Sequence, residues 1–478
     1  MSADNDFVVV ANRLPVDLVT NSDGTQDWNP SPGGLVAALS PVLESEKGCW
    51  VGWPGVADAE MEPFHTDGGV LLHPVTLTQH DFESFYEGFC NATVWPLFHD
   101  LIVPPVYNRD WWHSYRDVNE RFAEEVVKIA AQGATVWVQD YQLMLVPGIL
   151  RQRRPDLKIG FFLHIPFPAA DLYRQLPWRE EIIRGLLGAD LIGFHIEPYV
   201  ANFLNLMKDI APAGSHIGQP DFYSVEGNPA TREAGARIIA ADGHKVEVSA
   251  FPISIDPASV GKADPEAVAQ LRHDLGDPET VLLGVDRLDY TKGILQRLVA
   301  IEELFEAGAL DPETTTFVQV ATPSRERLTH YRRARSQVEE AVGRINGRFA
   351  PAGRAVVHYY HRSLPKSDLS NFYSLADVMV VTPFKDGMNL VAKEYVFCHG
   401  DGTGSLVLSE FAGAAFELPE ANLCNPFDID STKRAILTAV RSLRYEPELM
   451  EQRMRTMHRQ VQVHDVALWA RSFRDALR

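Results

Sequence analysis

Cysteine is scarce in this chain of 478 residues, and its four copies, Cys49, Cys90, Cys398 and Cys424, lie far apart. They form no CxxC pair and no Cys/His spacing, which argues against a structural zinc site and against a redox pair. Long apolar runs are lacking too, since no stretch approaches the ~20 residues of a membrane-spanning helix. The sequence therefore predicts a cytoplasmic protein with free thiols.

Positive charge is in deficit. The chain has 44 Lys and Arg against 64 Asp and Glu, a formal net charge of -20. Nucleic acids and anionic membranes are bound chiefly by surfaces rich in Lys and Arg, so this balance disfavours both as partners. The 45% hydrophobic and 23% charged fractions are typical of a globular protein, and the length suggests at least two domains.

Short apolar runs alternate with helix-like segments. Runs typical of buried strands lie at 7–11, 135–139, 159–163 and 190–194, with a helix-like segment at 118–131. The second half repeats this style, with strand candidates at 281–285, 316–320, 356–360, 378–381 and 405–408. Continuous apolar strands separated by helices predict α/β domains with parallel sheets that helices cover on both faces.

A domain boundary is indicated near the middle of the chain. Residues 236–254 are typical of a hairpin around Asp242-Gly243, and the segment PISIDP follows at 252–257. We predict two doubly wound domains, 1–253 and 254–460, with a cleft between them. The final helix-like stretch, within 461–478, fits either domain.

The segment DGMNLVAKE, Asp386 to Glu394, follows a predicted strand and opens a helix. Gly387 allows close approach of a ligand, and the free N–H groups near Asn389 and Leu390 form an anion site at the positive end of the helix. Glu394 lies one turn beyond Leu390, ~6 Å along the axis, where its carboxylate can accept hydrogen bonds from a ribose diol. The alternative is an ordinary turn, a helix start and a surface glutamate.

Cations and glycines stand at other strand ends. Arg287 and Lys292, in GVDRLDYTKG, follow the strand at 281–285, where they can stabilise a departing phosphate. Arg325, after the strand at 316–320, is a candidate phosphate clamp, and Gly33 and Gly34 precede a helix-like segment. Taken singly, each has an ordinary alternative: a solvated turn for Arg287 and Lys292, a surface arginine for Arg325, and a flexible turn for Gly33 and Gly34.

Two further strand ends carry polar side chains. Asp140 ends TVWVQD and His164 ends IGFFLH. Because ligands of parallel sheets lie beyond the carboxyl ends of the strands, both are candidates for binding sugar hydroxyls. Tyr86 and Trp95 offer aromatic surfaces for stacking on sugar rings. A helix-capping Asp, an interior His and core aromatics are the alternatives.

Two motifs are weaker than they look. Asp428-Ile429-Asp430 matches the DxD pattern of some metal-dependent sugar transferases, but it precedes the helical run TKRAILTAVRSL, so helix capping is the better explanation. Gly402-Thr403-Gly404 precedes a strand instead of following one, the wrong context for a nucleotide fingerprint. We therefore expect no metal and no cofactor.

The joint pattern is more specific than its parts. The segments VVVANRLP, PGGL, WPLFH, VQDYQL, FFLHIPFP, GVDRLDYTKG and VTPFKDGMNLVAKEY occur in this order between about Phe7 and Glu410. In these blocks the chain resembles the trehalose-6-phosphate synthases, retaining glycosyltransferases of the GT-B fold, in which two Rossmann-like domains face each other across a cleft. The weakest match is at 211–247. The resemblance implies transfer of glucose from a nucleoside diphosphate glucose to glucose 6-phosphate, giving α,α-trehalose 6-phosphate.

The resemblance also implies residue roles. Arg13, Tyr86, Asp140 and Arg325 match positions that hold glucose 6-phosphate, with the two arginines on its phosphate, and Trp50 is added to that set. The implied catalytic set is Arg287, Lys292, Asp140, His164 and Asp386. Trp95 and Ile165 match positions that shape anomeric selectivity.

The implied donor site is the larger set. Arg287 and Lys292 bind the diphosphate, Glu394 binds the ribose, and His164, Asp386, Met388 and Asn389 contact the glucose. Leu364 aligns with a contact to the base. The full set is Gly33, Gly34, Arg287, Lys292, Leu364, Asp386, Gly387, Met388, Asn389, Leu390, Val391, Ala392, Lys393 and Glu394.

The residues also suit the front-face route of that family, because Asp140, Asp386 and Glu394 all have binding roles that compete with attack on the anomeric carbon. The departing phosphate would then take the proton of the acceptor itself. One alternative is a non-catalytic, sugar-phosphate-binding regulatory homologue, and another is a nicotinamide-dependent oxidoreductase, which the missing GxGxxG disfavours. The donor base stays open between uridine, adenosine and guanosine, and the family tendency suggests a homo-oligomer, a dimer or a tetramer.

Overall fold

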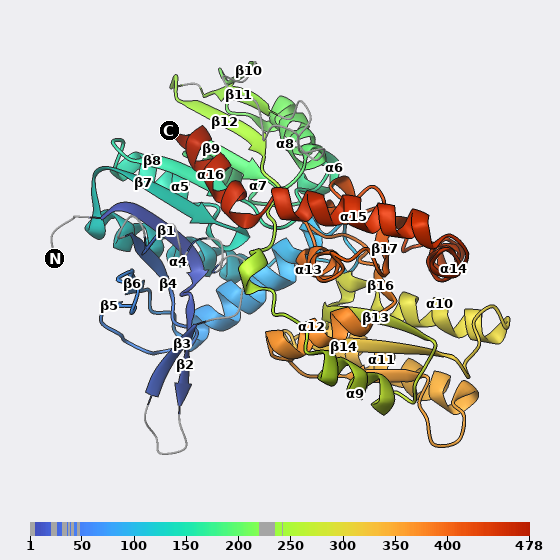
Figure 1. The fold of residues 1–478 in the computed structure, drawn as a ribbon. Coiled ribbons are helices and arrows are strands. Elements are labelled where there is room, and N and C mark those ends of the chain that lie inside the picture. Colours follow the sequence, from blue (N-terminus) through green and yellow to red (C-terminus); the bar gives the residue numbers. More distant parts are fainter. Residues whose placement is uncertain are drawn as a thin grey trace. The chain divides into compact units, whose positions relative to one another are not determined.

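The structure is a computed structural model that describes residues 5–20, 26–30, 36, 39, 43, 44, 48–218, 235–240 and 242–478. It divides into two compact units (Figure 1). Unit 1 comprises Met1–Ile253 together with Val466–Arg478, and unit 2 comprises Ser254–Asp465. Among the described helices, none is both long and apolar enough to cross a membrane.

Unit 1 is built on a ten-stranded sheet in the order β10-β11-β12-β9-β8-β7-β1-β4-β6-β5. The run from β12 to β6 is parallel, and only the outer pairs β10-β11, β11-β12 and β5-β6 are antiparallel. The strands are β1 Asn5–Arg13, β4 Cys49–Trp53, β5 Phe64–His65, β6 Leu71–Pro74, β7 Ala130–Gln139, β8 Lys158–Phe162, β9 Leu191–Phe194, β10 His216–Gly218, β11 Gly235–Ile239 and β12 Lys245–Ala250. A separate antiparallel pair joins β2 Val16–Thr20 to β3 Gln26–Pro30.

Helices and tight turns connect these strands. They are α2 Gln79–Asp81, the π-helix η1 Phe82–Val94, α3 Trp95–Phe98, α4 Arg109–Ile129, η2 Tyr141–Leu143, α5 Val146–Arg153, α6 Ala170–Tyr173, α7 Arg179–Leu186 and α8 Glu197–Ile210. The last helix, α16 Val466–Leu477, belongs to this unit, and its Phe473 ring stacks on Trp137 of β7 with 4.4 Å between centroids. Gly160 and Gly193 leave room for that ring, since a Cβ at either would lie 2.7 Å from it.

Unit 2 has a six-stranded, wholly parallel sheet in the order β15-β14-β13-β16-β17-β18. Its strands are β13 Thr280–Arg287, β14 Thr315–Thr322, β15 Val357–Tyr360, β16 Val378–Val381, β17 Ser405–Ser409 and β18 Asn422–Cys424. The connections are η4 Pro257–Ser259, α9 Pro265–Asp274, η5 Tyr290–Lys292, α10 Ile294–Glu306, α11 Thr329–Phe349, α12 Lys366–Leu375, α13 Leu390–Cys398, η6 Gly413–Phe416, α14 Ile429–Tyr445 and α15 Pro447–Val463.

Local sequence explains where these elements start. Asp264, Asp428 and Asn108 accept a backbone hydrogen bond at the starts of α9, α14 and α4, as capping residues do. The Asp428 cap confirms that the DxD-like pattern serves to start a helix. The predicted hairpin is also confirmed, because β11 and β12 pair antiparallel around Gly243, whose φ is +85°.

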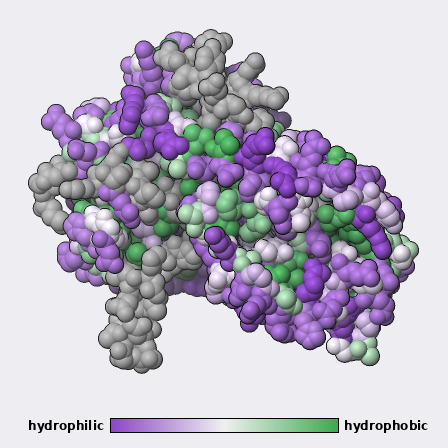
Figure 2. Space-filling model, in the orientation of Figure 1, coloured by the Kyte–Doolittle hydropathy of each residue, from purple (hydrophilic) through white to green (hydrophobic). Residues whose placement is uncertain are grey.

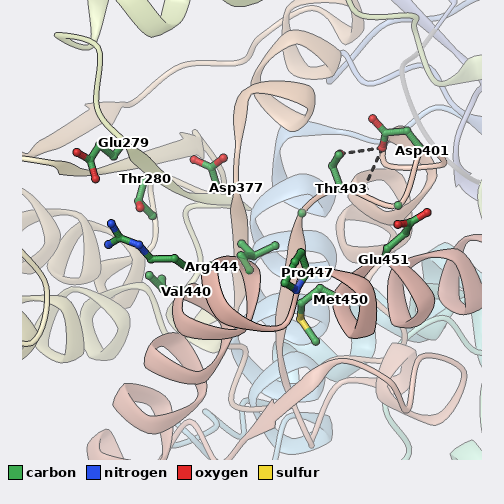
Figure 3. A pocket seen from close by; sticks show the side chains of 13 residues that line it. Glu279, Thr280, Asp377, Asp401, Thr403, Val440, Arg444, Pro447, Met450 and Glu451 are labelled. Atoms are coloured by element: carbon green, nitrogen blue, oxygen red, sulfur yellow. Dashed lines mark hydrogen bonds between the residues drawn. The ribbon is translucent and has the colours of Figure 1, made fainter.

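The face of unit 2 that is in view in Figure 2 is mainly hydrophilic, with small separate hydrophobic areas. A pocket of about 550 Å³ lies at the amino-terminal edge of its sheet, where β13, β16 and β17 begin. Glu279, Asp377, Asp401, Arg444 and Glu451 contribute its charged side chains, and Asp401 accepts a hydrogen bond from Thr403 (Figure 3). None of the predicted site residues lines this pocket. Those of unit 2 lie after the strands, at or beyond their carboxyl ends.

Candidate active site

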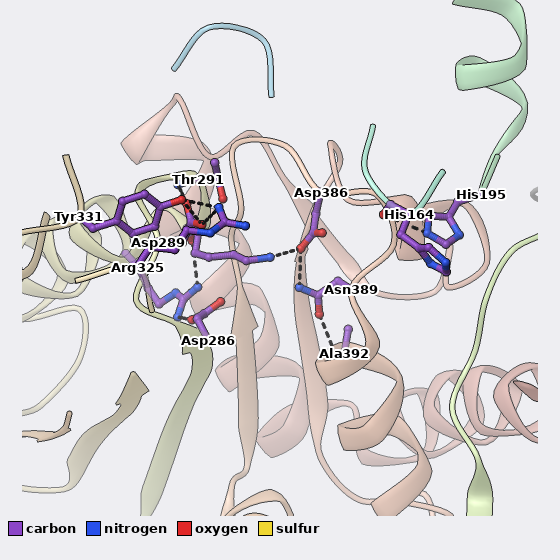
Figure 4. Close-up of polar contacts among 12 residues, drawn as sticks. His164, His195, Asp286, Asp289, Thr291, Arg325, Tyr331, Asp386, Asn389 and Ala392 are labelled. Carbon is purple, nitrogen blue, oxygen red and sulfur yellow. Dashed lines mark hydrogen bonds and ion pairs between the residues drawn. The ribbon is translucent and has the colours of Figure 1, made fainter. Parts of the chain in front are cut away.

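The carboxyl ends of β13 and β16 bring together two of the predicted segments. Lys292 closes η5, just beyond β13, and Asp386 follows β16. The Lys292 ammonium donates to Asp386 Oδ2 at 2.6 Å, and only 12% and 16% of the two side chains are exposed (Figure 4). The predicted leaving-group cation therefore lies directly beside the predicted helix start.

A chain of hydrogen bonds extends from this ion pair into α13. Asn389 Nδ2 donates to Asp386 Oδ2 at 3.1 Å, and Asn389 Oδ1 accepts from the Ala392 amide at 3.0 Å. Asn389 is thus the N-cap, with an unusual φ of +99°. The amides of Leu390 and Val391 belong to the first turn, whose N–H groups have no partner within a helix. A cation next to free amides at a helix start is an arrangement that can bind an anion.

The ribose candidate Glu394 lies on the same helix. Tyr373 of α12 donates to its Oε2 at 2.7 Å. Burial raises the pKa of Glu394, and the hydrogen bond from Tyr373 opposes that rise. The side chain of the adjacent Lys393 points elsewhere, because it is 1% exposed and its ammonium donates to Glu417 at 2.5 Å. Lys393 can serve a donor only through its backbone.

Under Arg287 and Lys292 lies a fully buried guanidinium, Arg297 of α10. Its Nη1 donates to Asp286 Oδ2 at 2.7 Å and to Gln319 Oε1 at 2.8 Å, and its Nη2 donates to the Lys292 carbonyl at 3.4 Å. Arg287 itself is exposed at the end of β13. Buried hydrogen bonds of Arg297 therefore support the loop that carries Arg287 and Lys292. Arg297 was not among the residues predicted from the sequence.

The predicted ligand of the acceptor phosphate in unit 2, Arg325, joins a buried cluster. Its Nη1 donates to the Tyr331 hydroxyl at 2.6 Å, and Tyr331 donates to Asp289 Oδ2 at 3.0 Å (Figure 4). The Asp289 carboxylate is fully buried, and the cations Arg325, Arg287 and Lys292 hold its pKa below the ordinary value despite burial.

In unit 1, Arg13 ends β1 beside aromatic rings. Its guanidinium carbon lies 5.2 Å from the centroid of the Trp53 ring, and that ring lies 6.3 Å from the ring of Tyr86 on η1. Trp50 is different, because it is 1% exposed and its Nε1 donates to the Arg13 carbonyl. Trp50 thus contacts only the backbone of Arg13, whereas the Trp53 ring lies against the Arg13 guanidinium and near the Tyr86 ring.

Asp140 and His164 also meet in unit 1. Asp140 Oδ1 accepts the His164 backbone N–H at 3.1 Å and does not cap η2. The His164 ring pairs with Gln139 Oε1 at 2.9 Å, and desolvation and the nearby His195 hold its pKa well below the ordinary value. His164 is therefore neutral near pH 7, as suits a group that binds an uncharged sugar hydroxyl. His195 Nε2 faces the His164 carbonyl at 3.1 Å.

Backbone strain marks three of the predicted residues. Asp140, Arg325 and Asn389 have φ of +70°, +47° and +99°. Such angles are uncommon outside glycine and cluster at functional sites, where the surrounding structure must hold them in place. This signal is not visible in the sequence.

The other predicted positions are placed as follows. Trp95 starts α3 and Ile165 follows β8, both 5% exposed. Leu364 is partly exposed between β15 and α12, and Gly387 and Met388 are buried beside Gly413. Gly33 and Gly34 lie outside the described residues. Across the described part of the chain, no group of three or more His, Cys, Asp or Glu is arranged to hold a metal ion.

Comparison with known proteins agrees with this geometry. The family model of glycosyltransferase family 20 matches residues 5–478 of the chain. The chain belongs to this family. A trehalose-6-phosphate synthase of Mycolicibacterium gilvum is 53% identical over 100% of this chain and 94% of its own length.

Two solved structures extend the comparison. An α,α-trehalose-phosphate synthase (UDP-forming) of Burkholderia xenovorans, in complex with glucose 6-phosphate, is 31% identical with a TM-score of 0.86, covering 98% of this chain and 99% of that one. An E. coli relative bound with UDP-2-fluoro glucose is 29% identical with a TM-score of 0.84, covering 98% of each. The predicted family, the GT-B class and the glycosyltransferase activity of a trehalose-6-phosphate synthase are thereby confirmed for this family-20 enzyme.

Proposed function

We propose that this family-20 enzyme transfers glucose from a nucleoside diphosphate glucose to glucose 6-phosphate, with retention, and releases α,α-trehalose 6-phosphate and the nucleoside diphosphate. The observation that carries the proposal is the corner in unit 2 where Lys292, Asp386 and the start of α13 meet. A cation next to free helix amides is a combination suited to binding a diphosphate. Uridine is the favoured base, because the two solved relatives are described as UDP-forming and as bound with a UDP sugar.

In this proposal, unit 2 holds the donor. Arg287, Lys292 and the amides of Leu390 and Val391 bind the diphosphate. The Glu394 carboxylate accepts hydrogen bonds from the ribose, and Asp386, Met388 and Asn389 contact the glucose. Leu364 contacts the base. The backbone of Gly387, Ala392 and Lys393 completes this set, together with Gly33, Gly34 and His164 of unit 1.

The acceptor is assigned to Arg13, Tyr86 and Asp140 of unit 1 and to Arg325 of unit 2. The ring of Trp53, under the Arg13 guanidinium, replaces Trp50 in the acceptor set, because the Trp50 side chain is buried and bonded to backbone. Trp95 and Ile165 are assigned to anomeric selectivity.

The proposed chemistry proceeds on one face of the sugar. The bond between the anomeric carbon and the β-phosphate oxygen breaks, and Arg287 and Lys292 stabilise the negative charge that develops on the phosphate. The anomeric hydroxyl oxygen of glucose 6-phosphate then bonds to that carbon, and its proton passes to the departing phosphate.

The side-chain contacts support this route. Asp386 is paired with Lys292, Asp140 accepts the His164 amide, and Glu394 accepts from Tyr373. Each carboxylate already has a positioning partner, so none is assigned as the nucleophile of a double displacement. A solved trehalose-6-phosphate synthase has been described in terms of glycosyl transfer with retention.

The same proposal includes the assembly and the location of the protein. We expect it to form a homo-oligomer, either a dimer or a tetramer, in the cytoplasm.

A coupled assay for nucleoside diphosphate release tests the proposal. UDP-, ADP- and GDP-glucose are compared, each with and without glucose 6-phosphate. We expect release that depends on glucose 6-phosphate and a kcat/KM that is highest for UDP-glucose. Ligand binding without release for any donor would instead identify a regulatory, non-catalytic homologue.

A further inference from the structure

The acceptor arginine of unit 2 is held by two buried residues that have no assigned role. Tyr331 lies in the first turn of α11 and is 2% exposed, and Asp289 precedes η5 with its carboxylate fully buried. The Tyr331 hydroxyl accepts a hydrogen bond from Arg325 Nη1 at 2.6 Å and donates one to Asp289 Oδ2 at 3.0 Å. A hydroxyl has one proton to donate, so these two bonds fix both its direction and its partners.

Arg325 needs such support, because its conformation is costly. Its φ is +47°, a region that non-glycine residues rarely adopt and keep only where the surroundings impose it. The guanidinium carbon lies 5.6 Å from the centroid of the Tyr331 ring, and Asp289 Oδ2 is 3.7 Å from Nη1. Ring, hydroxyl and carboxylate together restrain the guanidinium.

Asp289 also connects this arginine to the donor loop. Its Oδ1 accepts the Thr291 amide at 2.9 Å, and its carbonyl accepts the Lys292 amide at 3.0 Å. One buried carboxylate therefore sets the loop that carries Lys292 and, through Tyr331, the direction of Arg325.

We propose that Tyr331, supported by Asp289, is a positioning residue that directs Arg325 to the phosphate of the acceptor and so sets the affinity for a phosphorylated sugar. The inference rests on the proposed function, because it takes Arg325 as a phosphate ligand. A phosphate is best bound by a guanidinium that is already oriented, since orienting it on binding would cost conformational entropy.

The test is Tyr331→Phe, which removes one hydroxyl and keeps the ring. We expect KM for glucose 6-phosphate to rise about tenfold or more, the effect of losing a hydrogen bond to a charged group. The donor KM and kcat should stay within about threefold of the wild type. Tyr359→Phe is the matched control, because its hydroxyl is buried in the same unit with no hydrogen-bond partner in the described structure.

A double-mutant cycle separates positioning from a general structural role. Arg325→Met should weaken glucose 6-phosphate binding more than Tyr331→Phe does, and adding Tyr331→Phe to Arg325→Met should change nothing further. Binding of UDP, measured by calorimetry on the same samples, reports whether each variant is folded. Equal effects of Tyr331→Phe in both backgrounds, or parallel losses of acceptor and donor binding, would overturn the inference. A wild-type protein that does not use glucose 6-phosphate would overturn the proposed function instead.

Discussion

Lys292→Met is the substitution that probes the leaving-group corner most closely. It removes the ammonium that donates to Asp386 at 2.6 Å and keeps a side chain of similar length. Losing one preorganised charge that stabilises the departing group costs ~3–4 kcal/mol in the transition state, or ~10²–10³ in kcat. We therefore expect kcat for nucleoside diphosphate release to fall by at least a hundredfold at saturating substrates.

Stability should fall as well, but by a limited amount. Breaking a buried ion pair costs ~3–5 kcal/mol, because one charge is left unpaired. Asp386 keeps the hydrogen bond from Asn389 at 3.1 Å and is 16% exposed, so the loss of unfolding free energy should lie at the low end of that range. Urea unfolding measures it, and kcat is measured where the variant is folded.

Lys433→Met is the matched control for this experiment. Lys433 of α14 is likewise ion-paired, in its case with Glu303 at 2.6 Å and Asp430 at 2.7 Å. It lies outside the proposed site, and 24% of its side chain is exposed. We expect little change in the free energy of unfolding, because solvent screens this surface pair, and an unchanged kcat. The reasoning is refuted if Lys292→Met keeps kcat within threefold of the wild type, or if the two variants lose activity equally.

Three further predictions follow from the other contacts. The ionised Glu394 carboxylate is the form that accepts hydrogen bonds from both ribose hydroxyls, so the donor KM should fall as pH rises from 4.5 through the raised pKa of Glu394. Tyr373→Phe removes a hydrogen bond that favours the ionised form and should therefore move this pH profile of the donor KM to higher pH. An unmoved profile would contradict the assignment. Lys393→Met leaves Glu417 buried without its cation and should lower the unfolding free energy by ~3–5 kcal/mol in urea, whereas a loss below ~1 kcal/mol would be inconsistent with the pair. Asp140→Asn should lose acceptor binding and keep UDP binding in calorimetry, and the reverse pattern would refute its role.

Those strands that are continuous apolar runs were predictable from the sequence, whereas β4, β5, β6, β10 and β18 were not predicted. The predicted run at 378–381 coincides with β16, and those at 281–285 and 316–320 lie within β13 and β14. In a parallel sheet the residues after such strands share one edge, so Lys292 and Asp386 were expected at the same edge. Their direct pairing depends on β13 lying next to β16, which only the structure shows.

Side-chain partners contributed by other elements were not predictable in this way. Tyr373 and Tyr331 lie on helices with no motif of their own, and their hydroxyls reach Glu394 and Arg325 only through tertiary packing. Trp50 and Trp53 illustrate a different limit. They are three positions apart on one strand, so their side chains face opposite ways, and only the structure shows which ring lies under Arg13.

The product of the reaction tests the central claim most directly. Purified protein is incubated with UDP-glucose and glucose 6-phosphate, and the phosphorylated disaccharide is examined by proton NMR at both anomeric positions. The account predicts α,α-trehalose 6-phosphate, with both anomeric protons in the α configuration and one UDP released per disaccharide. A product with inverted configuration at the transferred glucose, or UDP release that yields only free glucose, would contradict it.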